Sequence, residues 1–290
     1  MSFFYLKNLG INKAMSNCYR YEKRNYDDPI FNHIDATYII NLENNGRITD
    51  IEDQLSKYHP SRDVFIVFNK GYKKCDKDEK INSTALDIID TNKNILLHSI
   101  ENKYDTILIL EDDFQFSEKI NEKKHQLNVD KFINENKNDE FLYYLGILPI
   151  LKSIDFGVHQ RVFISSGMHA CIFSEPMKYK ILEYIDNQKR WDSYVAEFLL
   201  NRYTYHIPLC YQLLPVTENS KTWSDHIPIV GTGVRNMSRY AIETLEVDKK
   251  VEPGHTIAYK LSETLYIVIV LLLVYITAKL LYKLLKKSDN

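Results

Sequence analysis

The sequence predicts an α/β fold in which a mixed, mostly parallel sheet is flanked by helices and followed by a C-terminal transmembrane helix. Two observations predict the sheet and its helices. Apolar runs of strand length alternate with stretches of helical periodicity, and the runs are apolar on both faces, as in strands covered by helices on both sides. A third observation, an uncharged apolar stretch near the C-terminus, predicts the transmembrane helix.

The composition is that of a globular protein. The chain has 290 residues, of which 44% are hydrophobic and 26% are charged, and its formal net charge is −2. These values exclude a disordered or low-complexity chain and argue against a protein dedicated to nucleic-acid binding. The abundance of Asn, Lys, Ile and Tyr, whose codons are rich in A and T, indicates an AT-rich genome such as that of a large DNA virus or an AT-rich bacterium.

Four runs predict strands, and the stretches between and after them predict helices. The runs are 36–42 (ATYIINL), 63–69 (DVFIVFN), 106–110 (TILIL) and 141–146 (FLYYLG). Helical spacing is present at 48–58 and 94–103, after Ser174 with its early Pro176, and from Trp191 onward. In an alternating α/β fold, ligands bind at the carboxyl ends of the strands.

These features divide the chain into five parts. We expect an N-terminal extension (1–35), a globular domain (36–230), a linker or C-terminal extension (231–260), a transmembrane anchor (261–283) and a basic tail (284–290).

The C-terminal stretch has the composition of a membrane anchor. Thr264–Ala278 carries no charge, but as a helix it spans roughly 22 Å, less than the ~30 Å hydrocarbon core. Lys279 can extend its ammonium group to the interface, so the anchor can reach the length of 261–283. A buried amphipathic helix would need a polar face, and from Tyr266 to Tyr275 only the two tyrosines are polar. We therefore expect one membrane span.

Two rules disagree about the side of the membrane on which the domain lies. The N-terminal residues lack the apolar core and the cleavage site of a secretory signal, which predicts a tail anchor with the domain in the cytosol. The positive-inside rule instead places the basic tail, with Lys283, Lys286 and Lys287, in the cytosol. We give the missing signal more weight, because the tail is very short and lysines also flank the other side of the span.

The four cysteines predict reduced thiols. Cys18, Cys75, Cys171 and Cys210 lie far apart and form no C-x-x-C pair. This spacing excludes a sequence-visible zinc ribbon and a disulfide-dense secreted module.

An acidic triplet follows the third predicted strand. Glu111, Asp112 and Asp113 come directly after the apolar run 106–110. Adjacent carboxylates repel one another and lose solvation at a strand end, and a divalent cation offsets both effects. Oxygen ligands alone favour Mg²⁺ or Mn²⁺, which can neutralise a diphosphate leaving group. The alternative is an acidic turn that faces solvent.

The order of these motifs resembles that of glycosyltransferase family 25, which includes lipooligosaccharide and collagen galactosyltransferases. Members open with a strand that ends in Asn-Leu and is followed by an Arg, as at Asn41, Leu42 and Arg47. They share the acidic motif at 110–113 and a hydrophobic-Leu-Gly strand, as at 144–146. The Ser-His pair of the family is present in reversed order, as His98-Ser99, and weaker parallels lie at 165–173, 191–193 and 208–225.

The resemblance implies a GT-A type, Rossmann-like fold that binds a nucleotide-diphosphate sugar together with Mn²⁺ or Mg²⁺. It implies transfer of a hexose, such as galactose, to a saccharide or protein hydroxyl. Asn41 and Arg47 would bind the nucleotide, Arg47 as a fork on phosphate, although an ordinary surface arginine is the alternative. Asp113 and Asp112 would be metal ligands, and Glu111 would contact the ribose or orient the ligands.

An inverting transfer also needs a base for the proton of the acceptor hydroxyl. Asp192 is the candidate, with Glu197 as the alternate, and the competing interpretation is an acid at a helix start favoured by the helix dipole. His226 is the candidate for a further metal ligand, ahead of His169 and His206.

Two other functions remain open. The first is a non-catalytic, glycosyltransferase-like module that is tethered to the membrane, which the reversed His98-Ser99 pair favours. The second is a metal-dependent phosphotransferase or nuclease, which is disfavoured because the sequence has no Gly-rich phosphate loop.

Overall fold

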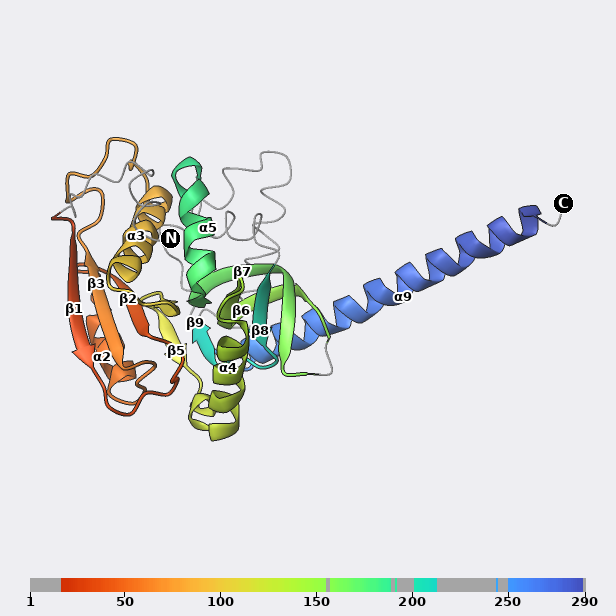
Figure 1. Cartoon of the computed structure of the whole chain (residues 1–290), viewed down its shortest axis with the longest axis horizontal. Coiled ribbons are helices and arrows are strands. Elements are labelled where there is room, and N and C mark those ends of the chain that lie inside the picture. Colours follow the sequence, from red (N-terminus) through yellow and green to blue (C-terminus); the bar gives the residue numbers. More distant parts are fainter. Residues whose placement is uncertain are drawn as a thin grey trace.

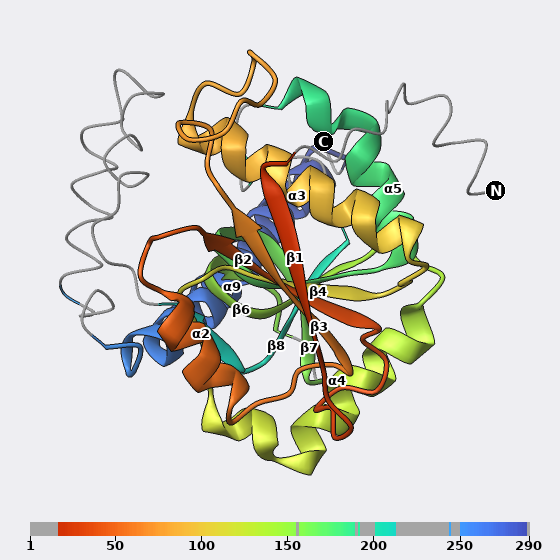
Figure 2. The ribbon, with the colours of Figure 1, turned by 90° about the vertical axis from the view of Figure 1, so that its left-hand side faces the viewer.

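A seven-stranded sheet forms the centre of the protein (Figures 1 and 2). The computed structural model describes residues 17–154, 157–188, 191, 201–212, 244 and 250–288. In sheet order the strands are β1 (Tyr19–Asn25), β3 (Asp63–Asn69), β2 (Ala36–Leu42), β4 (Ile107–Leu110), β7 (His159–Phe173), β6 (Leu142–Lys152) and β8 (Arg202–Tyr205). A second, two-stranded sheet joins β5 (Phe114–Phe116) to β9 (Cys210–Gln212).

Helices cover both faces of the large sheet, so the fold is a mixed α/β sandwich of helix, sheet and helix (Figure 2). Apolar side chains of α3 (Thr84–Glu101) and α5 (Glu175–Tyr184) pack against one face. Those of α2 (Ile48–Leu55) and α4 (Lys123–Asn136) pack against the other. Two short 3₁₀ helices, η1 (Glu118–Asn121) and η2 (Ile185–Asn187), lie beside α4 and α5. Burial on both faces explains why the strand sequences are nearly continuously apolar.

The sheet is mixed, as expected, but the prediction that it is mostly parallel is wrong, because antiparallel pairs outnumber parallel ones. β2 pairs in parallel with β3 and β4, and β6 with β8. The pairs β1–β3, β4–β7, β6–β7 and β7–β8 are antiparallel. A short connection, 153–158, joins β6 to β7, and a parallel pair would need a much longer crossover. An apolar run shows that a strand is covered on both faces but carries no signal for its direction.

The domain includes residues on both sides of the range 36–230. β1 lies within the part expected to be an extension and forms the edge of the sheet beside β3. At the other end, α9 (Gly254–Ser288) begins inside the expected linker, and its first turns contact β6. There His255 and Tyr259 are buried, so the start of α9 is part of the folded domain.

The rest of α9 projects away from the domain (Figure 1). Within α9, Gly254–Lys286 is long and apolar enough to cross a membrane, and none of its most apolar window is buried. Among the described residues it is the one helix with these properties. The expected C-terminal apolar helix is therefore present, and it is continuous with the domain.

Two helix starts differ from the expectation, one in its position and one in its N-cap. α3 begins ten residues before the expected 94–103, and its N-cap Ser83 accepts a hydrogen bond from the N–H of Leu86. Ser174 precedes α5 as expected, but its hydroxyl makes no cap hydrogen bond. It donates instead to the carbonyl of Asp139, at 2.7 Å, and accepts from the N–H of Phe141, at 3.0 Å.

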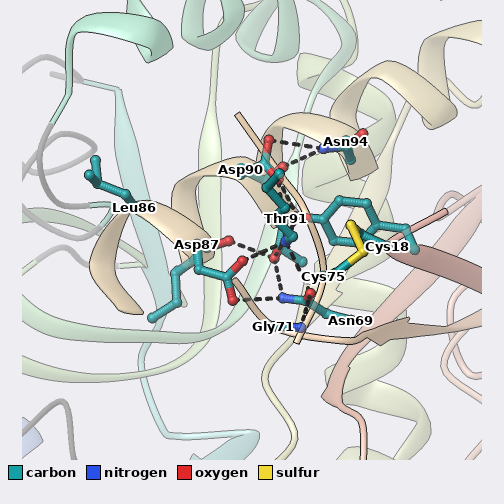
Figure 3. A network of polar contacts seen from close by, with 12 residues as sticks. Cys18, Asn69, Gly71, Cys75, Leu86, Asp87, Asp90, Thr91 and Asn94 are labelled. Atoms are coloured by element: carbon teal, nitrogen blue, oxygen red, sulfur yellow. Dashed lines mark hydrogen bonds and ion pairs between the residues drawn. A yellow bond between two sulfur atoms is a disulfide. The ribbon is translucent and has the colours of Figure 1, made fainter. Parts of the chain in front are cut away.

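The expectation of four reduced thiols is wrong for one pair. Cys18 and Cys75 form a disulfide with a Cα–Cα distance of 5.6 Å (Figure 3). Cys171 and Cys210 are buried and are not disulfide-bonded. The sheet brings the pair together, because Tyr19 at the start of β1 lies opposite Asn69 at the end of β3, and the chain then leads to Cys75. Their sequence separation of 57 residues gave no sign of this.

A polar network lies beside the disulfide (Figure 3). Asn69 donates hydrogen bonds to Asp87 at 3.1 Å and to Thr91 at 3.0 Å, and its side-chain oxygen accepts the N–H of Gly71. The ammonium group of Lys77, almost fully buried, pairs with Asp87 and Asp90. The network and the disulfide together fix the loop after β3 against α3.

Candidate functional site

The site lies where β2 and β4 end side by side. Ile39 of β2 is opposite Leu110 of β4, so continuation of the same register would put Asn41 opposite Asp112. The backbone N–H of Glu111 donates to the carbonyl of His169 on β7, at 3.0 Å, which fixes the start of the acidic triplet. The carboxyl ends of two neighbouring parallel strands thus bring the triplet beside the loop that follows β2.

Arg47, from that loop, lies between two carboxylates of the triplet. Its Nη1 is 2.9 Å from Oδ1 of Asp112 and 3.1 Å from Oδ2 of Asp113. Asn45 also donates to Asp112, and its oxygen accepts the N–H of Arg47 at 3.0 Å. The loop makes this turn with positive φ angles at Asn44 and Gly46, a conformation that Asn and Gly adopt at the lowest cost.

Gln212 holds the other side of the triplet. Its amide donates to Glu111 at 2.9 Å and to Asp113 at 3.0 Å. Gln212 ends β9, where it pairs with Phe114 of β5, and its carbonyl lies 3.0 Å from Nε2 of His255 at the start of α9. The sequence interpretation missed Gln212, because nothing in its local sequence distinguishes it and only the β5–β9 pairing brings it to the triplet.

Close packing beneath the triplet requires a glycine. A Cβ at Gly146 on β6 would lie 1.8 Å from the carbonyl oxygen of Cys210 and 2.6 Å from Nε2 of His169. His169 is fully buried, and burial, with a smaller contribution from His255, lowers its pKa to about 3. His169 is therefore a neutral ring that supports β9 from below.

Burial and the guanidinium group of Arg47 act in opposite directions on the two aspartates. The side chains of Asp112 and Asp113 are 21% and 15% exposed. Burial raises the pKa of both carboxyl groups, even though Arg47 lowers it. Burial would lower the pKa of Arg47, but Asp112 and Asp113 raise it overall. One guanidinium thus only partly offsets the cost of burying two carboxylates.

Two carboxylates are the acidic groups at this edge that face the same partner. Asp112 and Asp113 both contact the guanidinium group of Arg47, whereas Glu111 contacts Gln212. No group of three or more His, Cys, Asp or Glu side chains among the described residues is arranged to hold a metal. Mg²⁺ typically takes one or two protein carboxylates and completes its shell with phosphate oxygens and water. In addition, Oδ1 of Asn41 is buried and has no hydrogen-bond partner in the described part of the chain.

The structure brings together five of the residues selected from the sequence. Asn41, Arg47, Glu111, Asp112 and Asp113 all lie at the carboxyl edge of β2 and β4. The candidate base Asp192, its alternate Glu197 and the candidate ligand His226 lie outside the described residues.

Of the other histidines considered in the sequence, His169 packs beneath this edge, whereas His206 and His98 lie away from it. His206 is beside Tyr205, with ring centroids 4.7 Å apart, next to α4. His98 lies near the end of α3 that leads into the start of β4, and its ring stacks on Tyr21 at 4.2 Å. His98 therefore belongs to the core at the opposite edge of these strands.

No protein-family model and no curated protein matches this chain. One solved structure similar to it is the crystal structure of A197 from STIV, which is 10% identical. The alignment covers 62% of this chain and 86% of that chain, with a TM-score of 0.35. A likeness at this level carries no argument about fold or function.

Proposed function

We propose that this protein is a membrane-anchored glycosyltransferase with a GT-A type fold, which transfers a hexose from a nucleotide-diphosphate sugar to a saccharide or protein hydroxyl. The observation that carries the proposal is the convergence of Asp112 and Asp113 on Arg47 at the carboxyl edge of parallel strands. This edge is where α/β sheets bind nucleotides. The motif order that resembles glycosyltransferase family 25 supports the same function.

Arg47 is the residue whose contacts would change when a diphosphate binds at the site. Its planar guanidinium group now neutralises Asp112 and Asp113, and the same group can form paired hydrogen bonds with a diphosphate. When Arg47 turns to phosphate oxygens, both carboxylates lose their counter-ion and attract another cation. Nucleotide and cation are therefore expected to bind together.

The other residues of the edge hold the ligand and the carboxylates in position. Asn41 offers an unused oxygen to a ribose hydroxyl or a base N–H, and Gln212 keeps Glu111 and Asp113 in a fixed orientation. A Mn²⁺ or Mg²⁺ ion at Asp112 and Asp113 would neutralise the charge that develops on the diphosphate leaving group. Asp192 remains the candidate base for the acceptor hydroxyl.

Calorimetric titration of the full chain in detergent tests this function, with UDP added in the presence and absence of Mn²⁺. We expect binding that requires Mn²⁺ and that is lost in Asp113→Asn while the melting temperature is kept. The matched control is Asp53→Asn on α2, whose carboxylate is exposed and pairs only with the exposed Lys57. Unchanged Mn²⁺-dependent binding in Asp113→Asn would contradict the assignment of the metal ligand.

One observation favours the second candidate function, a non-catalytic membrane-tethered module. Arg47 already satisfies both aspartates, and the described residues contain no ready-made metal group. In such a module Arg47 would act as a permanent structural counter-ion. The titration separates the two functions, because the module would show no UDP binding that depends on Mn²⁺. Other nucleotide diphosphates would be the next ligands to test.

A further inference from the structure

An exposed apolar surface lies along the β6–β7 hairpin. Four side chains form it and are called here the hairpin patch: Ile150 (52% exposed), Ile154 (40%), Phe163 (46%) and Ile164 (50%). Ile150, Phe163 and Ile164 come from the two strands near their connection, where Leu151 pairs with Ile164 and Lys152 with Val162, and Ile154 lies in the connection itself. Single exposed apolar residues are ordinary on a protein surface, but several gathered on one structural element indicate an interaction site.

The hairpin patch is continuous with the apolar part of α9. The ring of Phe163 stacks on that of Tyr266, with centroids 6.0 Å apart and planes 5° from parallel. One turn earlier on α9, Glu263 accepts a hydrogen bond from the ammonium group of Lys152 on β6, at 2.6 Å. In Figure 1 the hairpin lies at the end of the domain from which α9 projects.

Within the described residues, the start of α9 is anchored directly in the domain. Tyr259 is buried and bonds to Thr204 of β8, at 3.0 Å between the hydroxyl oxygens, and Glu263 is the next anchored residue. A helix rises about 1.5 Å per residue, so Tyr266 lies only about 5 Å beyond Glu263 along the axis. From Leu265 onward the large apolar side chains of α9 are exposed.

The position of Tyr266 fixes the depth of the hairpin. Tyrosine at the end of an apolar helix lies at the membrane–water interface, where its ring is among lipid tails and its hydroxyl reaches water. Phe163 stacks on Tyr266 and therefore lies at the same depth. The charge of Lys152, next to the patch on β6, does not oppose this arrangement, because it is fully buried and paired with Glu263.

We propose that the hairpin patch is a second membrane contact, which inserts into the interfacial layer of the bilayer that α9 crosses. The domain then rests on the membrane in one orientation, held by the helix and the hairpin together. This inference depends on α9 being a membrane span and is independent of the proposed glycosyltransferase activity. It also holds for either orientation of the span.

Site-specific fluorescence of the full chain in phosphatidylcholine vesicles tests the proposal. Ile154→Cys and Ile164→Cys are each labelled with the polarity-sensitive dye NBD under non-reducing conditions. The native cysteines do not compete for the dye, because Cys171 and Cys210 are buried and Cys18 is bonded to Cys75. The matched control is Leu127→Cys on α4, which is also an exposed apolar position at 53%.

We expect the labels at 154 and 164 to emit at shorter wavelength and to be quenched by nitroxide lipids, whereas the label at 127 stays water-like and unquenched. Two hairpin positions are used in case one variant misfolds, and absence of labelling in the unsubstituted chain confirms that the native thiols are protected.

Water-like, unquenched emission at both hairpin positions would overturn the proposal. Equal quenching at 127 would also overturn it, because it would indicate general adsorption. Blue-shifted emission without lipid quenching would assign the patch to contact between two copies of the chain.

Discussion

Gly146 is the residue at which β6 comes closest to β9, and its replacement by alanine is expected to be severely destabilising. The added methyl group would lie 1.8 Å from the Cys210 carbonyl oxygen, which is backbone and cannot move without displacing β9. We expect a loss of about 3 kcal/mol or more in the free energy of unfolding, measured by urea denaturation. Gly157→Ala is the matched control, because nothing lies within 4 Å of its added methyl group. Equal stability of the two variants would contradict the packing described here.

The close packing at Gly146 also affects the candidate site. β9 positions Gln212, and Gln212 orients Glu111 and Asp113. The close approach at Gly146 therefore supports the acidic triplet, although Gly146 bonds to none of its carboxylates. This separates two kinds of residue at the site: Arg47, Asp112 and Asp113 carry charge, whereas Gly146 and His169 set the distance between strands.

At the scale of elements, the Cys18–Cys75 disulfide joins the start of β1 to the loop after β3. β1 is an edge strand that pairs only with β3 in the described sheet, so the disulfide limits its fraying. Because the cysteines are separated by 57 positions in the sequence, removal of the cross-link should cost about 4 kcal/mol through the entropy of the unfolded chain. Cys18→Ser/Cys75→Ser should unfold at lower urea, and added reductant should shift the unsubstituted chain alone. A wild-type transition insensitive to reductant would contradict a stabilising disulfide.

The same disulfide bears on the location of the domain. Disulfides persist in oxidising compartments and are rare in the cytosol. The positive-inside rule, which places the basic tail in the cytosol, agrees with an oxidising environment for the domain. The disulfide therefore weighs against the expectation that the domain lies in the cytosol.

Sequence reasoning predicted individual strands, but it did not predict contacts between residues that lie far apart in the sequence. Strands at 36–42 and 63–69 were predicted with their observed bounds, because burial on both faces leaves a continuous apolar run. The direction of β7, the pairing of Cys18 with Cys75 and the position of Gln212 depend on which strands become neighbours, and no local pattern encodes this. The acidic triplet could be selected because its charges are costly at a strand end, and Arg47 because of the resemblance to glycosyltransferase family 25, whereas Gln212 is neutral and has no such signature.

At the scale of the whole molecule, the fold is expected to lose stability in mild acid. Burial lowers the pKa of His98 and His159 to about 4 and that of His169 to about 3, against an ordinary value of 6.5. The unfolded chain binds protons at these rings below pH 6.5, whereas the folded chain does not bind them until the pH approaches the lowered values. The stability from these neutral rings is therefore full above pH 6.5 and is lost as the pH falls toward 4.

His98 allows this effect to be isolated from the other titrating groups. Its Nδ1 is 2.8 Å from the Tyr38 hydroxyl, and its ring lies between Tyr21 and Phe65 in the core. His98→Gln removes the titration, so the stability advantage of the unsubstituted chain over the variant should shrink by about 1 kcal/mol between pH 7 and pH 5, because solvent screens part of the effect at a ring that is only partly buried. Urea denaturation at both pH values measures this difference, and Asn102→Gln, an exposed change just after α3, controls for the region. A difference that does not change with pH would mean that His98 is protonated in the folded protein, and its ring would then need a counter-charge that the surrounding aromatic side chains do not supply.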